Sequence, residues 1–490
     1  MDNSNKCKSC NIGYKLIDGK CRPDFYIKAV YKVNAEGDNI DLFSSNCKTA
    51  ISHLYIEGKN ITLNGLDYTF KNAGNQTVYF QFKKSTYSSN SRCFLNNEKL
   101  ISATFSDFNE YFPNCGLVSL FEGCSNLVSV DVSNLYKYNW AHLYNMFKNC
   151  YKLVHVNFNI KYILVVNSTD NMFINCHSLT SIDLSKLDVS KVTNFNYMFS
   201  DCYSLKTINV QGFKLDNGET INYMFHNCTS LESIDLSSFQ PNKLTSMNYA
   251  FYNCFSLTSI NLNKMYTSRV YTMTYLFYNC TSLKFLDISS FNTENVKYMN
   301  RMFENCKSLT SINFGNNFNT NIVIEMNRLF SNCHSLELID YPITFKLATL
   351  NSFFMNCYSL TSVNLENFDT SKVVDFKNMF YNCYKLSSID ISKFIFKDSA
   401  AMQNMTRGCY SLTSLNFQNP TPIWLYFEGS FYDCPNLNFL NFTIVRNTII
   451  NFPLFNGNIS DSGTIILKKD FYNRQNPSFI PSDWNLILLD

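Results

Sequence analysis

The chain has 490 residues, of which 46% are hydrophobic and 16% are charged, and its formal net charge is +3 at pH 7. This near balance gives no electrostatic argument for binding nucleic acid or an anionic membrane surface. No run of about 20 apolar residues occurs, so we expect no transmembrane helix. The first residues also lack the apolar stretch of a signal peptide. The composition predicts a well-buried soluble protein.

The first predicted segment, residues 1–24, contains Cys7, Cys10 and Cys21. Three cysteines cannot all pair with one another. In one interpretation, one of them pairs with a later cysteine, Cys47, Cys93 or Cys115. In the interpretation we favour, the other half of a cysteine-rich module and a signal peptide lie upstream of this sequence. Zinc binding by Cys7 and Cys10 is the weaker interpretation, because no second pair of ligands follows at finger-like spacing.

The segment from Cys7 to Cys21 resembles the closing half of an epidermal-growth-factor-like or furin-like module. The resemblance implies a secreted or cell-surface protein. Residues 25–95 follow with short alternating apolar runs, at 26–33, 53–57, 67–70 and 77–82, separated by glycine and asparagine. Such runs predict a small all-β domain.

Residues 96–442 are predicted to be one short unit copied end to end. Thirteen cysteines mark its register, and their spacing is 26 residues except for single intervals of 27, 24 and 25. They are Cys124, Cys150, Cys176, Cys202, Cys228, Cys254, Cys280, Cys306, Cys333, Cys357, Cys383, Cys409 and Cys434. A fixed period of this length predicts a solenoid. Residues 443–490, where the pattern decays, are interpreted as the C-terminal cap that a solenoid core requires.

Each unit is predicted to hold one short helix and one short strand. The residue before each cysteine is Asn, Asp or Gly, the types that best tolerate a left-handed backbone, which suits the end of a helix. Upstream, apolar residues such as Met299, Met302 and Phe303 recur at helical spacing. Downstream, Ile182 and Leu184 alternate as in a half-buried strand. The predicted fold class is therefore an α/β repeat solenoid with a parallel sheet.

The repeat cysteines are predicted to be free and buried. Neighbouring strands lie about 4.8 Å apart with parallel side chains, an orientation that does not suit a disulfide. We expect thirteen thiols acting as small apolar side chains. Phe stands three residues before the cysteine in every unit except that of Thr406 and is expected to form a parallel aromatic spine.

The repeat resembles the leucine-rich repeat, in the subclass of bacterial surface protein A-like (BspA-type) repeats. The closest matches are 302–314, 379–394 and 354–373, and the resemblance covers about two thirds of the chain. Proteins of that family occur in bacteria and in parasitic protists, and are mostly surface adhesins or proteins of unknown role. The resemblance implies a non-enzymatic surface protein that binds partners along its open sheet.

The outward strand positions are the candidate binding face. The residue between the last two apolar positions alternates between Asp and Asn for twelve units. Adjacent like charges destabilise a sheet, so we favour a solvated structural ladder and keep a ligand-binding face as the alternative. The face comprises Asp183, Asn209, Asp235, Asn261, Asp287, Asn313, Asp340, Asn364 and Asp390, with the apolar Phe285 and Leu338.

A second candidate is a row of aromatic residues directly after the cysteines, which includes Tyr358, Tyr384 and Tyr410 on consecutive units. Such rings could stack on sugars. The interpretation we favour is a tyrosine ladder that packs on itself along one edge.

We predict no enzyme, cofactor or metal site, because the six histidines are scattered and no phosphate loop or nucleophile elbow occurs. A glycan hydrolase using ladder carboxylates is a weaker alternative, because the ladder gives no reason for one pair to be special. The candidate N-glycosylation sites are Asn60, Asn75, Asn167 and Asn458.

Our leading hypothesis is a cell-surface or secreted interaction protein that adheres to a protein or glycan ligand, such as a host-cell or matrix surface. The alternative is a cytoplasmic scaffold that assembles protein partners.

Overall fold

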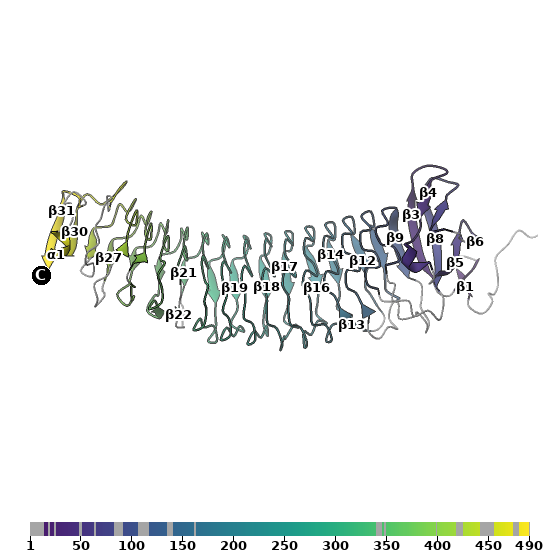
Figure 1. The fold of residues 1–490 in the computed structure, drawn as a ribbon, viewed down its shortest axis with the longest axis horizontal. Helices are drawn as coiled ribbons and strands as arrows, with labels where there is room; N and C mark the ends of the chain where they lie inside the picture. The colour runs from purple at the N-terminus through teal and green to yellow at the C-terminus, as the bar shows by residue number, and fades with distance from the viewer. Residues whose placement is uncertain are drawn as a thin grey trace, which may run out of the picture. The chain divides into compact units, whose positions relative to one another are not determined.

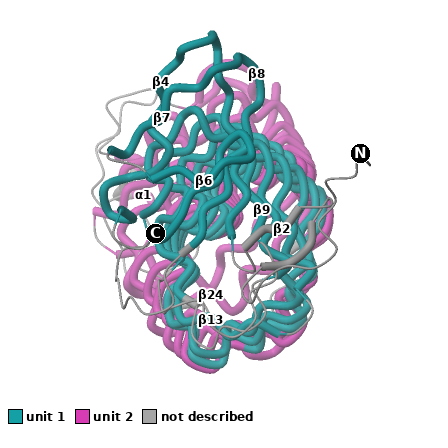
Figure 2. Tube along the Cα trace, turned by 90° about the vertical axis from the view of Figure 1, so that its right-hand side faces the viewer, with its two compact units in different colours: residues 1–240 teal, residues 241–490 magenta. Residues whose placement is uncertain are grey.

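The computed structural model describes most of the repeat region and parts of both ends. The described residues are 14–17, 20–23, 26–48, 51–62, 65–82, 92–105, 117–134, 141–160, 163–339, 345–346, 349–397, 399–417, 425–441, 455–473 and 480–489. They fall into two compact units, Met1–Gln240 and Pro241–Asp490 (Figure 2). The domain boundaries drawn from the sequence, after residues 24, 95 and 442, stay predictions.

Unit 1 begins with the predicted β-rich part. Its seven-stranded sheet has the order β12-β10-β9-β3-β8-β5-β6. The strands are β3 Ile27–Val33, β5 Ile51–Ile56, β6 Lys59–Ile61, β8 Gly74–Phe82, β9 Leu100–Phe105, β10 Ser129–Asp131 and β12 His155–Asn157. Two antiparallel pairs lie outside this sheet, β1 Tyr14–Ile17 with β2 Lys20–Pro23, and β4 Asn39–Asp41 with β7 Asp67–Thr69.

The first repeat strands extend this sheet without a break. β3 pairs antiparallel with β8 on one side and with β9 on the other, and β9 then pairs parallel with β10. Asn97 takes the place of the repeat cysteine in the first rung, and its side-chain nitrogen donates to the Asp41 carbonyl at 2.8 Å. The N-terminal strands thus cover the first rung of the solenoid (Figure 1).

Within the described residues, the Cys47–Cys93 disulfide joins a short 3-10 turn (Ser45–Cys47) to the segment before β9. This bond rules out Cys47 and Cys93 as partners of Cys7, Cys10 or Cys21, so that of the three partners considered only Cys115 is left. Cys7, Cys10 and Cys115 lie outside the described residues, as does the side chain of Cys21 in β2. The proposed growth-factor-like module therefore stays a prediction.

Each repeat contributes one short strand to a parallel stack. In unit 1 the further strands are β14 Ser181–Asp183, β16 Thr207–Asn209 and β17 Ser233–Asp235 (Figure 1). In unit 2 they are β18 Ser259–Asn261, β19 Phe285–Asp287, β20 Ser311–Asn313, β21 Leu338–Ile339, β23 Ser362–Val363, β25 Ser388–Ile389, β27 Ser414–Asn416 and β29 Phe439–Asn441. The central residue of each strand, such as Ile182 or Leu286, turns inward.

A second, shorter line of strands follows the first in many repeats. In unit 1 it consists of β11 Ala141–His142, β13 Leu164–Ser168 and β15 Leu187–Asp188. In unit 2 it consists of β22 Phe345–Lys346 with β24 Phe368–Asp369, and β26 Ala400–Ala401 with β28 Leu425–Tyr426. Strands β30 Gly463–Lys468 and β31 Trp484–Leu489 continue the sheet of β29 in parallel, with the helix α1 Lys469–Tyr472 between them.

The predicted helix in each repeat is wrong. Within the described residues, α1 is the only α-helix, and the segment before each cysteine is a series of turns. The left-handed residue expected before the cysteine is confirmed in every repeat, as at Asn305 with a φ of 64°. A second left-handed residue occurs four positions earlier, as at Arg301 with a φ of 55°. A backbone that turns left-handed at both positions cannot continue as a right-handed helix.

The hydrogen bonds of the Cys306 repeat show what replaces the helix. Met302, Glu304 and Cys306 each donate a backbone N–H to the carbonyl three residues earlier. The alternating residues donate instead to the next rung, as Phe303 does to the Leu329 carbonyl at 3.1 Å and Asn305 does to Ser331 at 2.8 Å. The left-handed residue is the third residue of its turn, as a type II turn requires. The turns therefore bond the rungs to one another, which an internally bonded helix would not.

The core confirms the predicted thiols and aromatic spine. All thirteen repeat cysteines are free and buried. The Phe rings stack nearly parallel in both units, as between Phe147 and Phe173 at 5.2 Å or between Phe303 and Phe330 at 5.4 Å. The thiols also have a role that the sequence did not suggest: the Cys306 Sγ donates to the Phe277 carbonyl one rung earlier at 3.1 Å. The same bond recurs from Cys124 to Cys228 in unit 1 and from Cys280 to Cys409 in unit 2.

We predict that Cys306→Ala lowers the free energy of unfolding by about 1–3 kcal/mol, because it removes the thiol's hydrogen bond to the Phe277 carbonyl, which then keeps only the Cys280 N–H, and because it opens a small cavity. Cys306→Ser keeps a donor and should be the more stable of the two variants. Denaturant unfolding of the full chain measures the order. If the thiol were only a small apolar side chain, the serine variant would be the less stable one.

Candidate interaction surface

The strand face consists of the outward side chains on either side of each strand's central residue. In unit 1, Asp183 lies beside Asn209 on the paired strands β14 and β16. In unit 2, Asp287 lies beside Asn313 and Phe285 beside Ser311 on β19 and β20. All of these side chains are exposed except Asn209, which is half-buried. Asp340 lies outside the described residues.

The Asp and Asn side chains of this face share one structural role. In most of them Oδ1 accepts the backbone N–H two residues later, as Asp287 does from Ser289 at 2.9 Å, whereas Asn416 Oδ1 has no hydrogen-bond partner. The same bond forms at Asp131, Asn157, Asp183, Asn209, Asp235, Asn261, Asn313, Asn364 and Asp390. This Asx turn ends the strand. It uses an oxygen that Asp and Asn both carry, so both residues fit the position.

The pKa values of three carboxylates on this face, Asp183, Asp287 and Asp390, are lowered, which favours their ionised form. Partial burial pushes the pKa of Asp287 upward, but hydrogen bonds from Ser289 and Asn313 outweigh it and leave the pKa lowered. The pKa of Asp183 is lowered in the same way, against burial, by Ser185, Asn209 and the Lys186 charge. For Asp390 the hydrogen bonds from Ser392 are the largest cause of the lowered pKa. An Asn on the adjacent rung therefore stabilises the carboxylate instead of repelling it.

Two apolar side chains interrupt the polar face of unit 2. Phe285 on β19 is 53% exposed and Leu338 on β21 is 54% exposed. One rung, carrying Ser311, separates them, which places them about 10 Å apart along the stack. Lys284 and Glu337, which directly precede them, are exposed charges of opposite sign. The Phe285–Leu338 patch therefore combines an apolar centre with polar and charged neighbours.

The predicted aromatic edge packs on itself. In unit 2, His334 stacks on Tyr358 with ring centres 4.5 Å apart, Tyr358 on Tyr384 at 4.7 Å, and Tyr384 on Tyr410 at 5.0 Å. In unit 1, His177 lies between Tyr151 and Tyr203. The ring faces of Tyr358 and Tyr384 are covered by their neighbours. Sugar stacking would need an open ring face, so this geometry favours the self-packed ladder.

The turns carry two further ladders that the sequence analysis missed. Side chains of the left-handed residues bond from rung to rung, as Asn279 Nδ2 does to Asn253 Oδ1 at 2.7 Å. The same bond joins Asn149 to Asn175 and Asp201 to Asn227 in unit 1, and Asn305 to Asn382 in unit 2. Gly408 stands at the same position with a φ of 74°, a left-handed conformation that glycine adopts without strain. The signal for this ladder in the sequence was the Asn that recurs directly before the repeat cysteine.

The second missed ladder is a tyrosine–arginine cluster in unit 2. Tyr249 stacks on Tyr275 at 4.6 Å, and the Arg301 guanidinium lies over Tyr275 at 5.4 Å. Arg301 and Arg328 both form ion pairs with Glu304, a carboxylate only 3% exposed. Burial raises the pKa of Glu304, and the two arginines oppose that shift. The rings and charges of this cluster contact one another, although Glu304 Oε2 has no hydrogen-bond partner, and these mutual contacts indicate a structural role.

The predicted glycosylation sites differ in exposure. Asn60 in β6, Asn75 in β8 and Asn458 are exposed, whereas Asn167 in β13 is half-buried. Among the residues the structure describes, no three His, Cys, Asp or Glu side chains gather as a metal site. Within the same ranges, no helix is long and apolar enough to cross a membrane.

The geometry defines a repeat solenoid of stacked parallel strands whose rungs are joined by turns. Two family profiles match it. Residues 141–260, 245–344 and 315–420 match the family described as Mycoplasma protein of unknown function, DUF285. Residues 42–164 match the BspA type leucine rich repeat region. The chain belongs to the DUF285 family, whose matches cover more than half of it, and the predicted resemblance to BspA-type leucine-rich repeats is confirmed.

Solved structures that resemble the chain include other leucine-rich-repeat proteins. A T. pallidum protein is 17% identical, with 53% of this chain and 83% of that chain covered and a TM-score of 0.24. A Eubacterium ventriosum protein is 15% identical, with 66% and 88% covered and a TM-score of 0.26. A Leptospira interrogans protein is 11% identical, with 82% and 98% covered and a TM-score of 0.22. The search of curated proteins finds no match.

We predict that Asp287→Asn flattens the acid dependence of stability. The folded-state pKa of Asp287 is lowered, so its contribution is complete above the ordinary carboxyl pKa of about 3.9 and is lost as the pH falls through the lower folded value. The asparagine keeps the Asx-turn oxygen but does not titrate. Urea unfolding between about pH 6 and pH 2.5 measures the difference.

The control is Asn313→Asp, which places a second carboxylate on the rung beside Asp287. This variant should be less stable than the parent chain at neutral pH, because adjacent like charges repel. Its stability should recover on acidification, when the carboxylates are protonated. Equal stability of this variant and the parent chain at neutral pH would contradict the electrostatic account of the ladder.

Proposed function

We propose that the chain is a non-enzymatic adhesion protein that binds a protein partner through the strand face of unit 2. The observation that carries the proposal is the Phe285–Leu338 patch, in which both side chains are more than half exposed on an otherwise polar face. Protein interfaces concentrate their binding energy in a few apolar or aromatic anchors surrounded by polar contacts. The leucine-rich-repeat fold fits a protein-interaction role.

The rigidity of the face supports the same proposal. The Asx turns fix the ends of β19 and β20, and the next-rung hydrogen bonds of the turns hold each repeat to its neighbour. A preorganised surface loses little conformational freedom on binding. The flat arrangement suits an extended partner surface better than a small molecule, which needs a concave site.

We also propose a cell-surface or secreted location. Disulfides persist in oxidising compartments, and the Cys47–Cys93 disulfide supports one. The free thiols do not oppose this location, because burial raises the pKa of Cys306 to about 12 and keeps it protonated and unreactive. The exposed positions of Asn60 and Asn458 would leave them accessible to glycosylation.

The adhesion proposal predicts that the double variant Phe285→Ser and Leu338→Ser binds its partner at least several-fold more weakly. The assay measures retention of beads coated with the full chain on plates of enzymatically deglycosylated matrix proteins and on epithelial monolayers. The matched control is Tyr271→Ser with Ile324→Ser, which removes apolar side chains that are 48% and 49% exposed and lie outside the strands. Equal retention of all three proteins, or no retention of any, would contradict the proposal.

The proposed cell-surface location predicts that antibodies against the protein bind to intact source cells, without permeabilisation. Alkylation of the denatured native protein without reductant should label the thirteen repeat thiols and leave Cys47 and Cys93 unlabelled. Signal that appears only after permeabilisation, with Cys47 and Cys93 reduced, would overturn the surface location and favour the cytoplasmic scaffold.

A further inference from the structure

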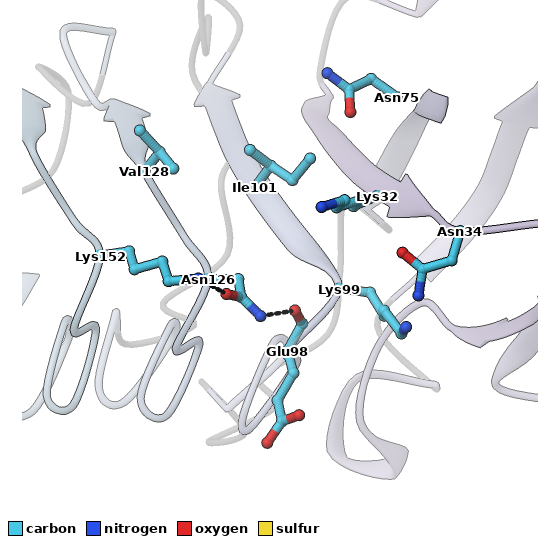
Figure 3. A pocket seen from close by; sticks show the side chains of 9 residues that line it. All are labelled: Lys32, Asn34, Asn75, Glu98, Lys99, Ile101, Asn126, Val128 and Lys152. Carbon is cyan, nitrogen blue, oxygen red and sulfur yellow. Dashed lines mark hydrogen bonds between the residues drawn. The ribbon is translucent and has the colours of Figure 1, made fainter. Parts of the chain in front are cut away.

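A pocket of about 450 Å³ opens in unit 1, where the N-terminal antiparallel strands meet the first repeat strands (Figure 3). The fold builds it from both parts. Lys32 on β3 lies opposite Asn75 on β8, and the Lys32 backbone N–H donates to the Lys99 carbonyl at 2.8 Å just before β9. β3 and β9 shift register beside this point, between Val30 and Tyr31. The hollow is therefore a consequence of joining two kinds of sheet.

The polar lining of the pocket is cationic. Lys32, Lys99 and Lys152 contribute three amines, and Glu98 contributes the one carboxylate. In Figure 3 the Glu98 carboxylate points away from Lys32 and Ile101, on the far side of its backbone. Lys152 Nζ donates to Asn126 Oδ1 at 2.7 Å, which orients one amine at the edge of the pocket. Neither Lys32 nor Lys99 has an ion-pair partner among the described residues. The pocket thus offers positive charge to a ligand.

The rest of the lining combines amides with a small apolar surface. Asn34, Asn75 and Asn126 supply amide groups that can both donate and accept hydrogen bonds. Ile101 and Val128 lie on adjacent rungs, joined by the Val128 N–H and the Ile101 carbonyl at 2.7 Å, and Val128 is 37% exposed. A pyranose ring presents hydroxyl groups at its edge and C–H groups on its face. The asparagine amides suit the hydroxyl groups, and the side chains of Ile101 and Val128 suit the C–H face.

We propose that this basic pocket binds an acidic saccharide, a pyranose unit that carries a carboxylate or a sulfate group. The lysine amines pair with the acidic group, the asparagine amides bond the hydroxyls, and Ile101 and Val128 contact the ring. The pocket has the volume of a small-ligand site. Its lining has no aromatic ring on which a nucleic-acid base would stack, which disfavours a nucleic-acid ligand. The proposal does not depend on the protein-binding role of unit 2.

The experiment uses the full chain from a bacterial host, so that Asn75 carries no glycan, and measures binding by calorimetry. The probes are heparin oligosaccharides, which carry sulfate and carboxylate, hyaluronan oligosaccharides, which carry carboxylate alone, and neutral dextran. We expect binding to one or both acidic probes, weaker at high salt, and none to dextran. Binding to heparin alone assigns sulfate as the recognised group, and comparable binding to both assigns the carboxylate.

The test variant is Lys32→Gln with Lys99→Gln, which should weaken binding by about tenfold or more, because it removes two charge-assisted contacts. The matched control is Lys191→Gln with Lys214→Gln, which removes the same charge from exposed positions of unit 1 outside the pocket. It should bind like the parent chain, as should the Phe285→Ser and Leu338→Ser variant. Equal losses in both lysine variants would reveal only non-specific attraction and overturn the proposal. No binding by the parent chain, or equal binding of dextran, would overturn it as well.

Discussion

The structure depends on hydrogen bonds that join each rung to the next through the turns before the repeat cysteine. Alternate backbone N–H groups of these turns donate to the following rung, as Phe303 does to Leu329. The cysteine thiol donates back to the preceding rung, where Cys306 reaches the Phe277 carbonyl. Buried backbone groups without partners are costly, so no repeat could adopt this conformation alone. The near-constant period keeps the phenylalanine stack, the thiol bonds and the asparagine ladder in phase.

The same regularity determines where function can reside. Along the strand face, most Asp and Asn side chains are occupied as Asx-turn acceptors, and along the edge, the rings of Tyr358 and Tyr384 cover each other. Repeated features of this kind stabilise the stack and are alike on many rungs. Specific recognition needs a departure from the repeat. The exposed Phe285 and Leu338 are one such departure, and the junction of β3 with β9 is another.

The two departures differ in chemistry. The Phe285–Leu338 patch is flat, with an apolar centre and mixed charges beside it, which suits a protein surface. The pocket lined by Lys32, Lys99 and Lys152 is concave and cationic, which suits a small acidic group. The first lies in unit 2 and the second in unit 1. The two proposed sites would therefore bind a protein and an acidic saccharide independently of each other.

The sequence alone determined the repeat, its register, the inward strand residues, the buried free thiols, the phenylalanine spine and the left-handed residue before each cysteine, because each of these repeats a local preference many times. Tertiary structure decided the rest. The spacing of Met299, Met302 and Phe303 fits a helix and a series of turns equally well, and the left-handed Arg301 between them has no local preference for that conformation. Only bonds to the neighbouring rung select the turns. The sequence also carried no sign of the lysine pocket, because Lys32 and Lys152 lie far apart in the chain and line one pocket only through the pairing of β3 with β9 and of β9 with the repeat strands that follow.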